Sequence, residues 1–529
     1  MNVVLKAALL FGSNMVLQRD KPVAVWGTSV PDTRITVRMQ GQETTTTADK
    51  YGNWSMRCGP FQLSFKEEME ICAGDEHLFY SNVQVGDVYL AGGQSNMEFH
   101  MRYDQDFAAE MDHCQNVDIR FFDYPEVSYP GQINEADYLK NYGFWRLAEP
   151  TQLERFSAVG YYFAKELQNR LHVPIGIVGC NWGGTPAAAW MSREAILSGG
   201  GALLLEEYEQ IIKNLDLAKY DCFFQSDPAS WRTDQLASPI TDILMFGGSE
   251  EELLRNFEAI GLNMSQARPE DFRPVIGPKH ERRPSGLYES MLCQVAPYTV
   301  RGILWYQGET DGDTHPELYD TLFPALIRDW RSLWGEKLPF LFVQIAPLGQ
   351  WLDCIGENYV PVRDAQQHTA DEVEGTGMAV ISDIGAENDI HPKKKQPVGL
   401  RLALLAMDRI YGIPTLCEAP CLETVQVEDG RLTLCFSNSG SGLYLAHETP
   451  DGSTSDETKL GGLQVFQEGR LLCANRLTAC AQGEHVIITG DEICEKKDTL
   501  VRLAKTGWFR VNLYNSADIP ARPAEYRCI

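Results

Sequence analysis

The first part of the chain alternates apolar and polar residues, up to about Gln84. This two-residue period is typical of short, half-buried strands, and Pro, Gly, Asp and Asn separate one strand from the next. The clearest segments lie at residues 23–28, 35–41 and 53–58. The pattern predicts a small N-terminal β-sandwich-like domain over residues 1–84.

From Val85 the pattern changes, because continuous apolar runs now alternate with segments of helical spacing. We expect strands at residues 87–93, 173–184, 300–309, 338–347 and 377–385. Helices are expected between and after them, at residues 156–171, 318–335 and 398–410. This alternation predicts an α/β domain with a parallel sheet over residues 85–413.

Two regions depart from that pattern. Residues 197–285 combine polar and charged helical stretches without clear strands, so we interpret them as an insertion that caps the α/β domain. Alternation returns at residues 431–438, 485–490 and 509–515, which predicts a C-terminal β-rich domain over residues 414–529.

Charge and composition exclude several classes of function. The net charge is −27 and acidic residues are spread along the chain, which disfavours nucleic acid and anionic membrane surfaces as partners. No apolar run is long enough to span a bilayer, and the N-terminus resembles a first strand rather than a signal peptide. The 14 cysteines show no dense framework spacing, which favours reduced, buried thiols and a cytoplasmic location. Because no paired CxxC elements and no HExxH occur, we expect neither a metal nor another cofactor.

Four short motifs follow predicted strands of the α/β region, at the edge where open parallel sheets bind ligands. The first is GGQSNM at residues 92–97, in which Ser95 follows two glycines that allow a tight turn and close backbone approach. A helix starting there would offer N–H groups to a developing negative charge. Ser95 could equally be an ordinary helix cap.

The second and third motifs offer hydrogen-bond donors for an oxyanion. In NWGGT at residues 181–185, Gly184 could donate a backbone N–H, although a plain turn explains the glycines as well. In WYQGET at residues 305–310, Gln307 directly follows an apolar run, where an amide needs partners. It could point at an oxyanion or simply hydrogen-bond loop backbone.

The fourth motif is DIHP at residues 389–392, ahead of a predicted helix. A histidine can take the proton of a serine and return it to a leaving alcohol, and a nearby carboxylate can fix its tautomer. The alternative role of His391 and Asp389 is helix capping. Together, a serine, oxyanion donors and a late histidine supply every part of an acyl-transfer site.

At these residues the chain resembles the sialate O-acetylesterases of the SGNH-hydrolase superfamily. The resemblance rests on the GQSNM and WYQGE motifs, which occur in the family's order, and on the segments at residues 86–99, 173–191 and 389–403. It implies a three-layer, flavodoxin-like SGNH domain with flanking β-rich parts. It also implies a serine esterase, a carboxylic ester hydrolase that removes O-acetyl groups from sialic acid.

The resemblance further implies roles for individual residues. Ser95 stands at the nucleophile position and His391 at the base, and the N–H of Ser95 joins Gly184 and Gln307 in the oxyanion hole. Many SGNH enzymes have an aspartate three residues before the histidine, where this chain has Asn388. Asp389 is our choice for the residue that orients His391; Asp383 or a backbone carbonyl, which would leave a Ser–His dyad, are the alternatives.

Other functions remain open at this point. One is a broader carbohydrate acetylesterase, active on acetylated xylan-type oligosaccharides, and another is a catalytically dead scaffold that binds glycans. Sialic acid carries a carboxylate, so its recognition requires Arg or Lys near the site. The candidates in the insertion are Arg273, Lys279, Arg282 and Arg283.

Overall fold

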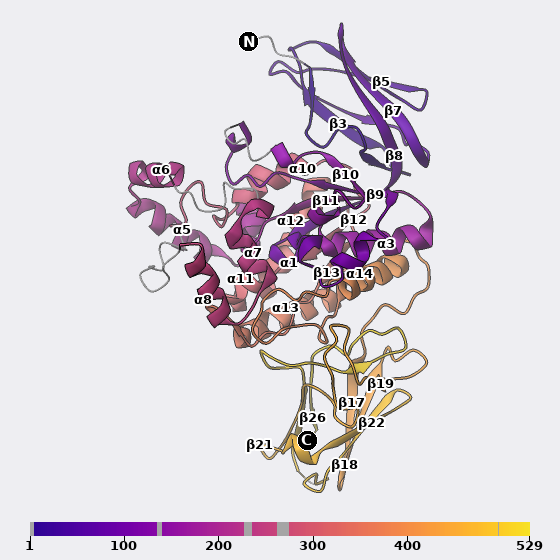
Figure 1. Ribbon diagram of the computed structural model, residues 1–529, viewed down its shortest axis with the longest axis vertical. Coiled ribbons are helices and arrows are strands. Elements are labelled where there is room, and N and C mark those ends of the chain that lie inside the picture. The colour runs from indigo at the N-terminus through magenta and orange to yellow at the C-terminus, as the bar shows by residue number, and fades with distance from the viewer. Residues whose placement is uncertain (1–4, 135–139, 227–234, 262–274, 496, 529) are drawn as a thin grey trace. The chain divides into compact units, whose positions relative to one another are not determined.

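The computed structural model describes residues 5–134, 140–226, 235–261, 275–495 and 497–528 (Figure 1). Contacts divide the chain into two compact units. The first comprises residues 1–246, 256–307 and 321–340, and the second comprises residues 247–255, 308–320 and 341–529. The predicted N-terminal strands all form in the first unit, as β3 (Val23–Thr28), β4 (Arg34–Met39) and β6 (Asn53–Cys58).

The N-terminal strands pair antiparallel in two groups. Strand β3 lies between β6 and the short β1 (Lys6–Ala7), while β4 pairs with β5 (Gln42–Thr47) and β7 (Ser64–Ala73). Alternation of buried and exposed positions along β6 matches the two-residue period of its sequence, because successive side chains point to opposite faces.

Strand β8 (Glu76–Gly93) connects these strands to the central sheet of the first unit. Its first half pairs antiparallel with β7, and its second half pairs parallel with β11 (Ile175–Asn181) and β12 (Gly302–Tyr306). The strand therefore runs without a break through residue 84, where the sequence suggests a domain boundary.

The central sheet of the first unit has the order β10, β9, β11, β8, β12. Strand β9 (Asn116–Asp123) is parallel to β11, and β10 (Trp145–Ala148) is an antiparallel edge strand. Because β11 and β12 are buried at every position, their continuous apolar runs are explained.

Helices cover this sheet. Helix α3 (Ala158–Leu171) begins where the Ser157 hydroxyl accepts the N–H of Gly160, a typical N-cap. Helix α12 (Tyr319–Trp334) brings Trp330 edge-on against Trp305 of β12, with ring centroids 5.2 Å apart. The alternation of strands and helices predicted from residue 85 onward is confirmed, and the fold class is α/β.

The expected insertion is helical in its described parts. It contains α5 (Ala202–Asn214), α6 (Leu217–Ser226), α7 (Pro239–Phe246) and α8 (Glu250–Ala259). Helix α7 is attached through Asp242, whose carboxylate accepts the Tyr103 hydroxyl at 2.8 Å and pairs with Arg102 at 3.3 Å.

The second unit contains the remaining predicted α/β elements and the C-terminal strands. Its first part has β13 (Phe340–Val343), α13 (Tyr359–Glu372), β16 (Thr376–Ala379) and α14 (Gln396–Arg409). Its last part has two four-stranded sheets, in the orders β17-β18-β23-β22 and β21-β20-β24-β26. Strands β18 (Arg431–Ser437) and β23 (His485–Thr489) match the predicted ranges, whereas only Leu513–Tyr514 of the third is a strand, β25.

These two sheets share one apolar core. Leu434 and Ile488 of the first sheet and Val465 and Val501 of the second are all buried in the same cluster. A sandwich of this kind explains the alternation along β18, where every second residue faces the core.

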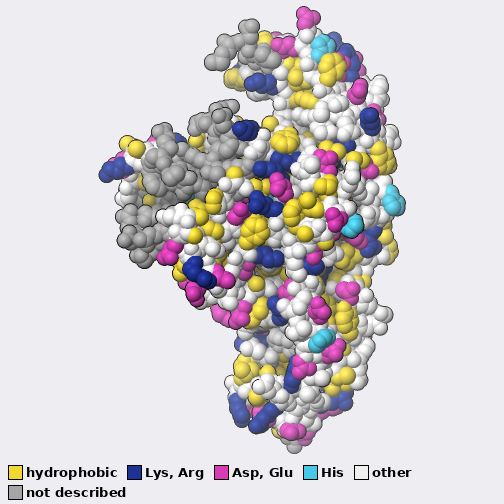
Figure 2. Space-filling model, viewed as in Figure 1, with side chains coloured by type: hydrophobic (Ala, Val, Ile, Leu, Met, Phe, Trp, Pro, Cys, Tyr) yellow, Lys and Arg dark blue, Asp and Glu magenta, His cyan; other side chains and the backbone are white. Residues whose placement is uncertain are grey.

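Surface charge, membrane-spanning segments and buried cysteines are three further features on which the sequence carries expectations. On the face drawn in Figure 2, acidic and basic side chains are interspersed. Within the described residues, no helix combines the length and apolarity that crossing a membrane requires. Cys180 is buried as expected, but Cys222, Cys473 and Cys480 are exposed, so buried thiols describe only part of the set.

Candidate active site

Three of the four motifs leave the central sheet at the same level. Gly93, the last residue of β8, is in register with Asn181 at the end of β11 and with Tyr306 at the end of β12. The loops that carry Ser95, Gly184 and Gln307 therefore begin side by side, as their placement after predicted strands indicated.

The two glycines before Ser95 are required by packing. A β-carbon at Gly92 would lie 2.7 Å from the ring of Trp330, and one at Gly93 would lie 2.2 Å from the Tyr306 carbonyl oxygen. Gly93 also has φ of +136°, a conformation that side chains disfavour. The chain can turn this close to β12 only because both residues lack a side chain.

Ser95 is the first residue of α1 (Ser95–Glu98), a single helical turn. Gln94 occupies the N-cap position and donates its N–H to the Tyr306 carbonyl at 3.1 Å, so Ser95 is not the cap. Ser95 is half-buried, and a β-carbon at Gly183 would lie 3.3 Å from its Cβ. The glycine loop after β11 therefore lies directly against the serine.

That glycine loop is held by side chains on both sides. The Thr185 hydroxyl donates to the Trp182 carbonyl at 2.7 Å and accepts the indole N–H of Trp190 at 3.0 Å. Gln307 is completely buried and donates Nε2–H to the Thr185 carbonyl at 3.2 Å. Gln307 thus donates one amide hydrogen to the backbone of the glycine loop.

Glu98 is a residue of this site that our sequence analysis did not consider. Its carboxyl accepts the N–H of Gly183 at 2.6 Å, so it fixes the glycine loop beside Ser95. Burial, together with the charge of nearby Asp123, raises its pKa to about 8, although the Gly183 hydrogen bond acts in the opposite direction. Its place three residues after Ser95, directly after the GGQSNM motif, was the available signal.

His391 and Asp389 belong to the second unit. The His391 ring is buried, and Trp351 packs edge-on against it with ring centroids 5.4 Å apart. Asp389 uses Oδ1 to accept the backbone N–H of His391 at 2.9 Å and Oδ2 to pair with Lys393 at 2.9 Å. Oδ1 lies 3.8 Å from Nδ1 of the ring, which is beyond hydrogen-bond distance.

The motif around His391 is not a helix cap. Helix α14 starts at Gln396 with Lys395 as its N-cap, so Asp389 and His391 lie in the preceding turn. Trp351 could not be expected at this place from local sequence patterns, because it comes from a separate hairpin, β14 (Gln350–Trp351) and β15 (Cys354–Ile355).

Asp383, the alternative to Asp389, has a different set of partners. Both of its oxygens accept hydrogen bonds from Arg401 at 2.7 Å, and Oδ2 also accepts the Tyr514 hydroxyl at 3.0 Å. Asp383 and Arg401 are both buried, so the pair is a structural ion pair within the second unit. This arrangement makes Asp383 a poor candidate for holding a histidine ring.

Two groups of side chains elsewhere have atoms close enough to share a metal ion. They are Glu70, Cys72 and His77 in the N-terminal strands, and Cys435, Glu484 and His485 in the C-terminal strands. Arg38 pairs with Glu70 at 3.0 Å and contacts the Cys72 sulfur at 3.4 Å, so a cation already occupies the first group. Neither group contains a residue of the four motifs.

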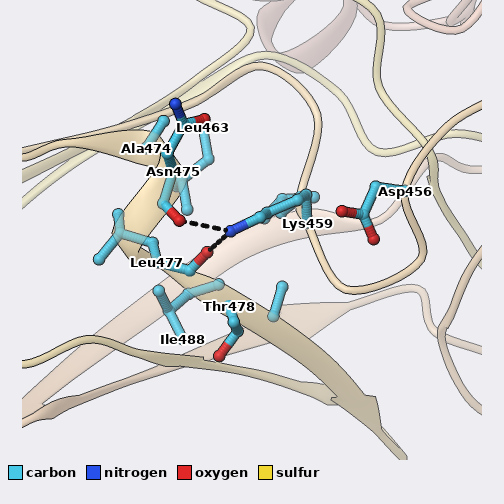
Figure 3. Close-up of a pocket in the computed structure, with 10 residues that line it drawn as sticks. Asp456, Lys459, Leu463, Ala474, Asn475, Leu477, Thr478 and Ile488 are labelled. Carbon is cyan, nitrogen blue, oxygen red and sulfur yellow. Dashed lines mark hydrogen bonds between the residues drawn. The ribbon is translucent and has the colours of Figure 1, made fainter.

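A cavity of about 220 Å³ lies in the C-terminal part of the second unit (Figure 3). Lys459 lines it and donates to the carbonyl oxygens of Asn475, at 3.1 Å, and Leu477. The described lining contains no serine, histidine or glutamine. This cavity contains none of the residues of the four motifs.

Parts of the chain that carry the four motifs are similar to known carbohydrate esterases. Residues 278–404, which include Gln307 and His391, match the family model for carbohydrate esterase, sialic acid-specific acetylesterase. The chain is 27% identical over 466 residues to sialate O-acetylesterase of Mus musculus, covering 80% of this chain and 77% of the relative. For the Homo sapiens enzyme the identity is 26% over 477 residues, covering 81% and 76%.

A solved structure extends the likeness to almost the whole chain. It is a carbohydrate acetylesterase from Xanthomonas citri, 28% identical, with a TM-score of 0.71 over 98% of this chain and 99% of that one. The resemblance to the sialate O-acetylesterases predicted from the motifs is confirmed.

Proposed function

We propose that this chain, a relative of the sialate O-acetylesterases, hydrolyses O-acetyl esters on sialic acid, with Ser95 as nucleophile and His391 as base. Its similarity to named sialate O-acetylesterases and to a carbohydrate acetylesterase supports a hydrolase that removes O-acetyl groups from carbohydrates. The observation that carries the assignment of Ser95, Gly184 and Gln307 is the common register of Gly93, Asn181 and Tyr306.

The proposed reaction has two halves. In the first, the Ser95 oxygen attacks the acetyl carbonyl carbon while His391 accepts the hydroxyl proton. The N–H groups of Ser95 and Gly184 and the side-chain amide of Gln307 stabilise the negative oxygen of the tetrahedral intermediate. Its collapse breaks the ester bond, and His391 returns the proton to the departing sugar oxygen.

In the second half, water attacks the acetyl-enzyme. His391 accepts a proton from the water, the oxyanion forms again at the same donors, and the carbon–oxygen bond to Ser95 breaks. The products are acetate and a serine that has regained its proton. The buried amide of Gln307 supports this scheme, because its contact with the Thr185 carbonyl holds it at the glycine loop.

A three-layer SGNH arrangement is part of the same proposal. The parallel pairing of β9, β11, β8 and β12 supports it, as does the helix that follows each predicted strand. A broader activity on acetylated xylan-type sugars is the second candidate. It is supported by the carbohydrate acetylesterase from Xanthomonas citri, whose description names no sialic acid.

Replacement of Ser95 tests the proposal. We expect Ser95→Ala to lower kcat for 9-O-acetyl-N-acetylneuraminic acid by up to about a million-fold, because loss of the nucleophile removes the covalent route. Acetate release is the measurement, and an unchanged circular dichroism spectrum shows that the variant is folded. Near wild-type turnover would exclude Ser95, whereas turnover of acetylated xylo-oligosaccharides alone would establish the second candidate.

A further inference from the structure

The segment at residues 277–285 carries three basic side chains next to the glycine loop of the active site. Two of them have acidic partners in the same unit: Lys279 pairs with Asp221 at 3.0 Å, and Arg283 pairs with Glu289 at 2.7 Å. Among the residues that the structure describes, no carboxylate lies within ion-pair distance of Arg282.

Arg282 lies over one of the proposed oxyanion donors. A β-carbon at Gly184 would lie 2.9 Å from Nη2 of Arg282, so the guanidinium covers the open face of that glycine. On the adjacent residue, a β-carbon at Gly183 would lie 3.3 Å from the Cβ of Ser95. The guanidinium and the serine therefore approach consecutive residues of the same short loop.

The backbone around Arg282 is fixed in this position. The N–H of Arg282 donates to Nδ1 of His280 at 3.0 Å, and the N–H of Ser285 donates to the Ala188 carbonyl at 2.9 Å. Burial lowers the pKa of His280, which keeps its ring neutral and able to accept that hydrogen bond. The Ser128 hydroxyl donates to the Lys279 carbonyl at 2.6 Å, so the segment is anchored at both ends.

We propose that Arg282 binds a carboxylate of the substrate while Ser95 attacks the acetyl group on the same sugar. An arginine offers two parallel N–H donors that match the two oxygens of a carboxylate, which a neutral sugar lacks. Arg282 is therefore the residue that makes the enzyme select acidic sugars. This inference rests on the proposed function, and it names the group that distinguishes sialic acid from neutral acetylated sugars.

Arg282 could instead stabilise the oxyanion, and the two roles predict different behaviour. A carboxylate-binding residue affects substrates only when they carry the carboxylate. An oxyanion-binding residue affects every acetyl ester to the same extent, because every such ester forms the same tetrahedral oxygen. The carboxylate must therefore be varied separately from the acetyl ester.

The test compares 9-O-acetyl-N-acetylneuraminic acid with its C1 methyl ester, which keeps the acetyl group and loses the charge. We expect wild-type kcat/KM to favour the free acid by roughly ten- to a hundredfold, the usual range for a hydrogen-bonded charge pair. In Arg282→Gln this preference should fall to about one, and Arg282→Lys should keep part of it. Because the readout is a ratio within one protein, a partial loss of folding cancels.

Arg283→Gln is the matched control, since Arg283 is adjacent in sequence and already paired with Glu289. It should keep the wild-type preference. Equal loss of activity on both substrates in Arg282→Gln, with the preference intact, would overturn the proposal. So would a wild-type enzyme that treats the free acid and the methyl ester alike.

A binding measurement separates this inference from the proposed function. N-acetylneuraminic acid and its methyl ester are used as competitive inhibitors of 4-nitrophenyl acetate hydrolysis, which needs no sialic acid turnover. The enzyme could fail to deacetylate sialic acid while the free acid still inhibits more strongly than the methyl ester, and only when Arg282 is present. That result would support the carboxylate site and refute the proposed substrate. Equal inhibition by both compounds would refute the carboxylate site.

Discussion

At the residue scale, Asp389 and His391 show that the role of a carboxylate depends on its distance from the ring nitrogen of the histidine. Asp389 is two residues before His391, yet its Oδ1 is 3.8 Å from Nδ1 and is hydrogen-bonded to the His391 backbone N–H instead. Lys393 neutralises its other oxygen. Asp389 thus shapes the turn that presents His391 more directly than it fixes the tautomer of the ring.

This geometry predicts a mild effect for Asp389→Asn. An asparagine can still accept the backbone N–H, so we expect kcat to fall by less than about a hundredfold, compared with about ten-thousandfold in a serine-protease triad. Asp389→Ala should be worse, because it also removes the turn's hydrogen bond. Steady-state kcat on an aryl acetate decides the question, and a loss of a thousandfold or more in Asp389→Asn would restore the full triad role.

Glu98 predicts a pH dependence of stability. Its pKa is about 8 in the native chain and ordinarily 4.5, so the native state holds a proton that the unfolded chain has lost between those values. The free energy of unfolding therefore decreases as pH rises from about 4.5 to about 8, and this contribution is flat above that window.

Glu98→Gln removes that proton and keeps an oxygen for the Gly183 N–H. We expect the melting temperatures of variant and wild type to be similar near pH 5, and the variant to become relatively more stable up to about pH 8. Thermal unfolding at several pH values gives the difference. If the melting temperatures of variant and wild type differ by the same amount at every pH, Glu98 ionises at the ordinary pKa of a glutamate.

At the scale of elements, the close approach of β8 and β12 fixes the position of the serine loop. Gly93 permits this approach, since a β-carbon there would overlap the Tyr306 carbonyl. The ring of Trp330 of α12 packs against Gly92, where a β-carbon would lie only 2.7 Å from it. The sheet, the helix and the turn therefore constrain one another, which is why the turn needs both glycines.

Gly93→Ala should disrupt this arrangement. The substitution adds an overlap with backbone and a positive φ, so we expect a loss of stability of at least about 1–3 kcal/mol together with lower activity. Gly12→Ala is the control, because a β-carbon there meets nothing within 4 Å and φ is not positive. Melting temperatures and kcat are compared; equal behaviour of the two variants would mean that the β8–β12 turn adapts easily.

At the scale of the whole molecule, contacts far apart in sequence hold the second unit together. Asp383 and Arg401 form a buried ion pair, and Tyr514 and the Asp518 carbonyl join it from the C-terminal segment. Arg363 of α13 likewise donates to the carbonyl oxygens of Thr506 and Gly507. The C-terminal strands are thus connected to the segment that carries His391 by buried polar contacts.

Asp383→Asn tests this connection. It leaves the Arg401 charge buried without its partner, and such a loss typically costs about 3–5 kcal/mol. Asp371→Asn is the control, because Asp371 pairs with Arg522 at a half-exposed position and exposed pairs contribute about 0–1 kcal/mol. Thermal unfolding should show a clear decrease only for Asp383→Asn. A decrease of the same size in both variants would contradict a special role for the buried pair.

The sequence by itself determined β8, β11 and β12, the main helices and the three loops of the first unit, whereas it did not predict the sheet strands β9 and β10. Those features follow from local physics: continuous apolar runs predict buried strands, glycines permit tight turns, and polar residues after a strand end lie at the sheet's edge. The motif order also indicated the resemblance to the sialate O-acetylesterases. Each of these signals is contained within about ten neighbouring residues, as in GQSNM and WYQGE.

Only the tertiary structure decided what the charged side chains do. The sequence favoured Asp389 over Asp383 for orienting His391, but Asp383 meets Arg401 of α14, and Asp389 meets its own turn and Lys393. The raised pKa of Glu98 and the position of Arg282 over Gly184 likewise depend on segments brought together from distant parts of the chain. Electrostatic roles depend on distance and burial, which the order of residues does not contain.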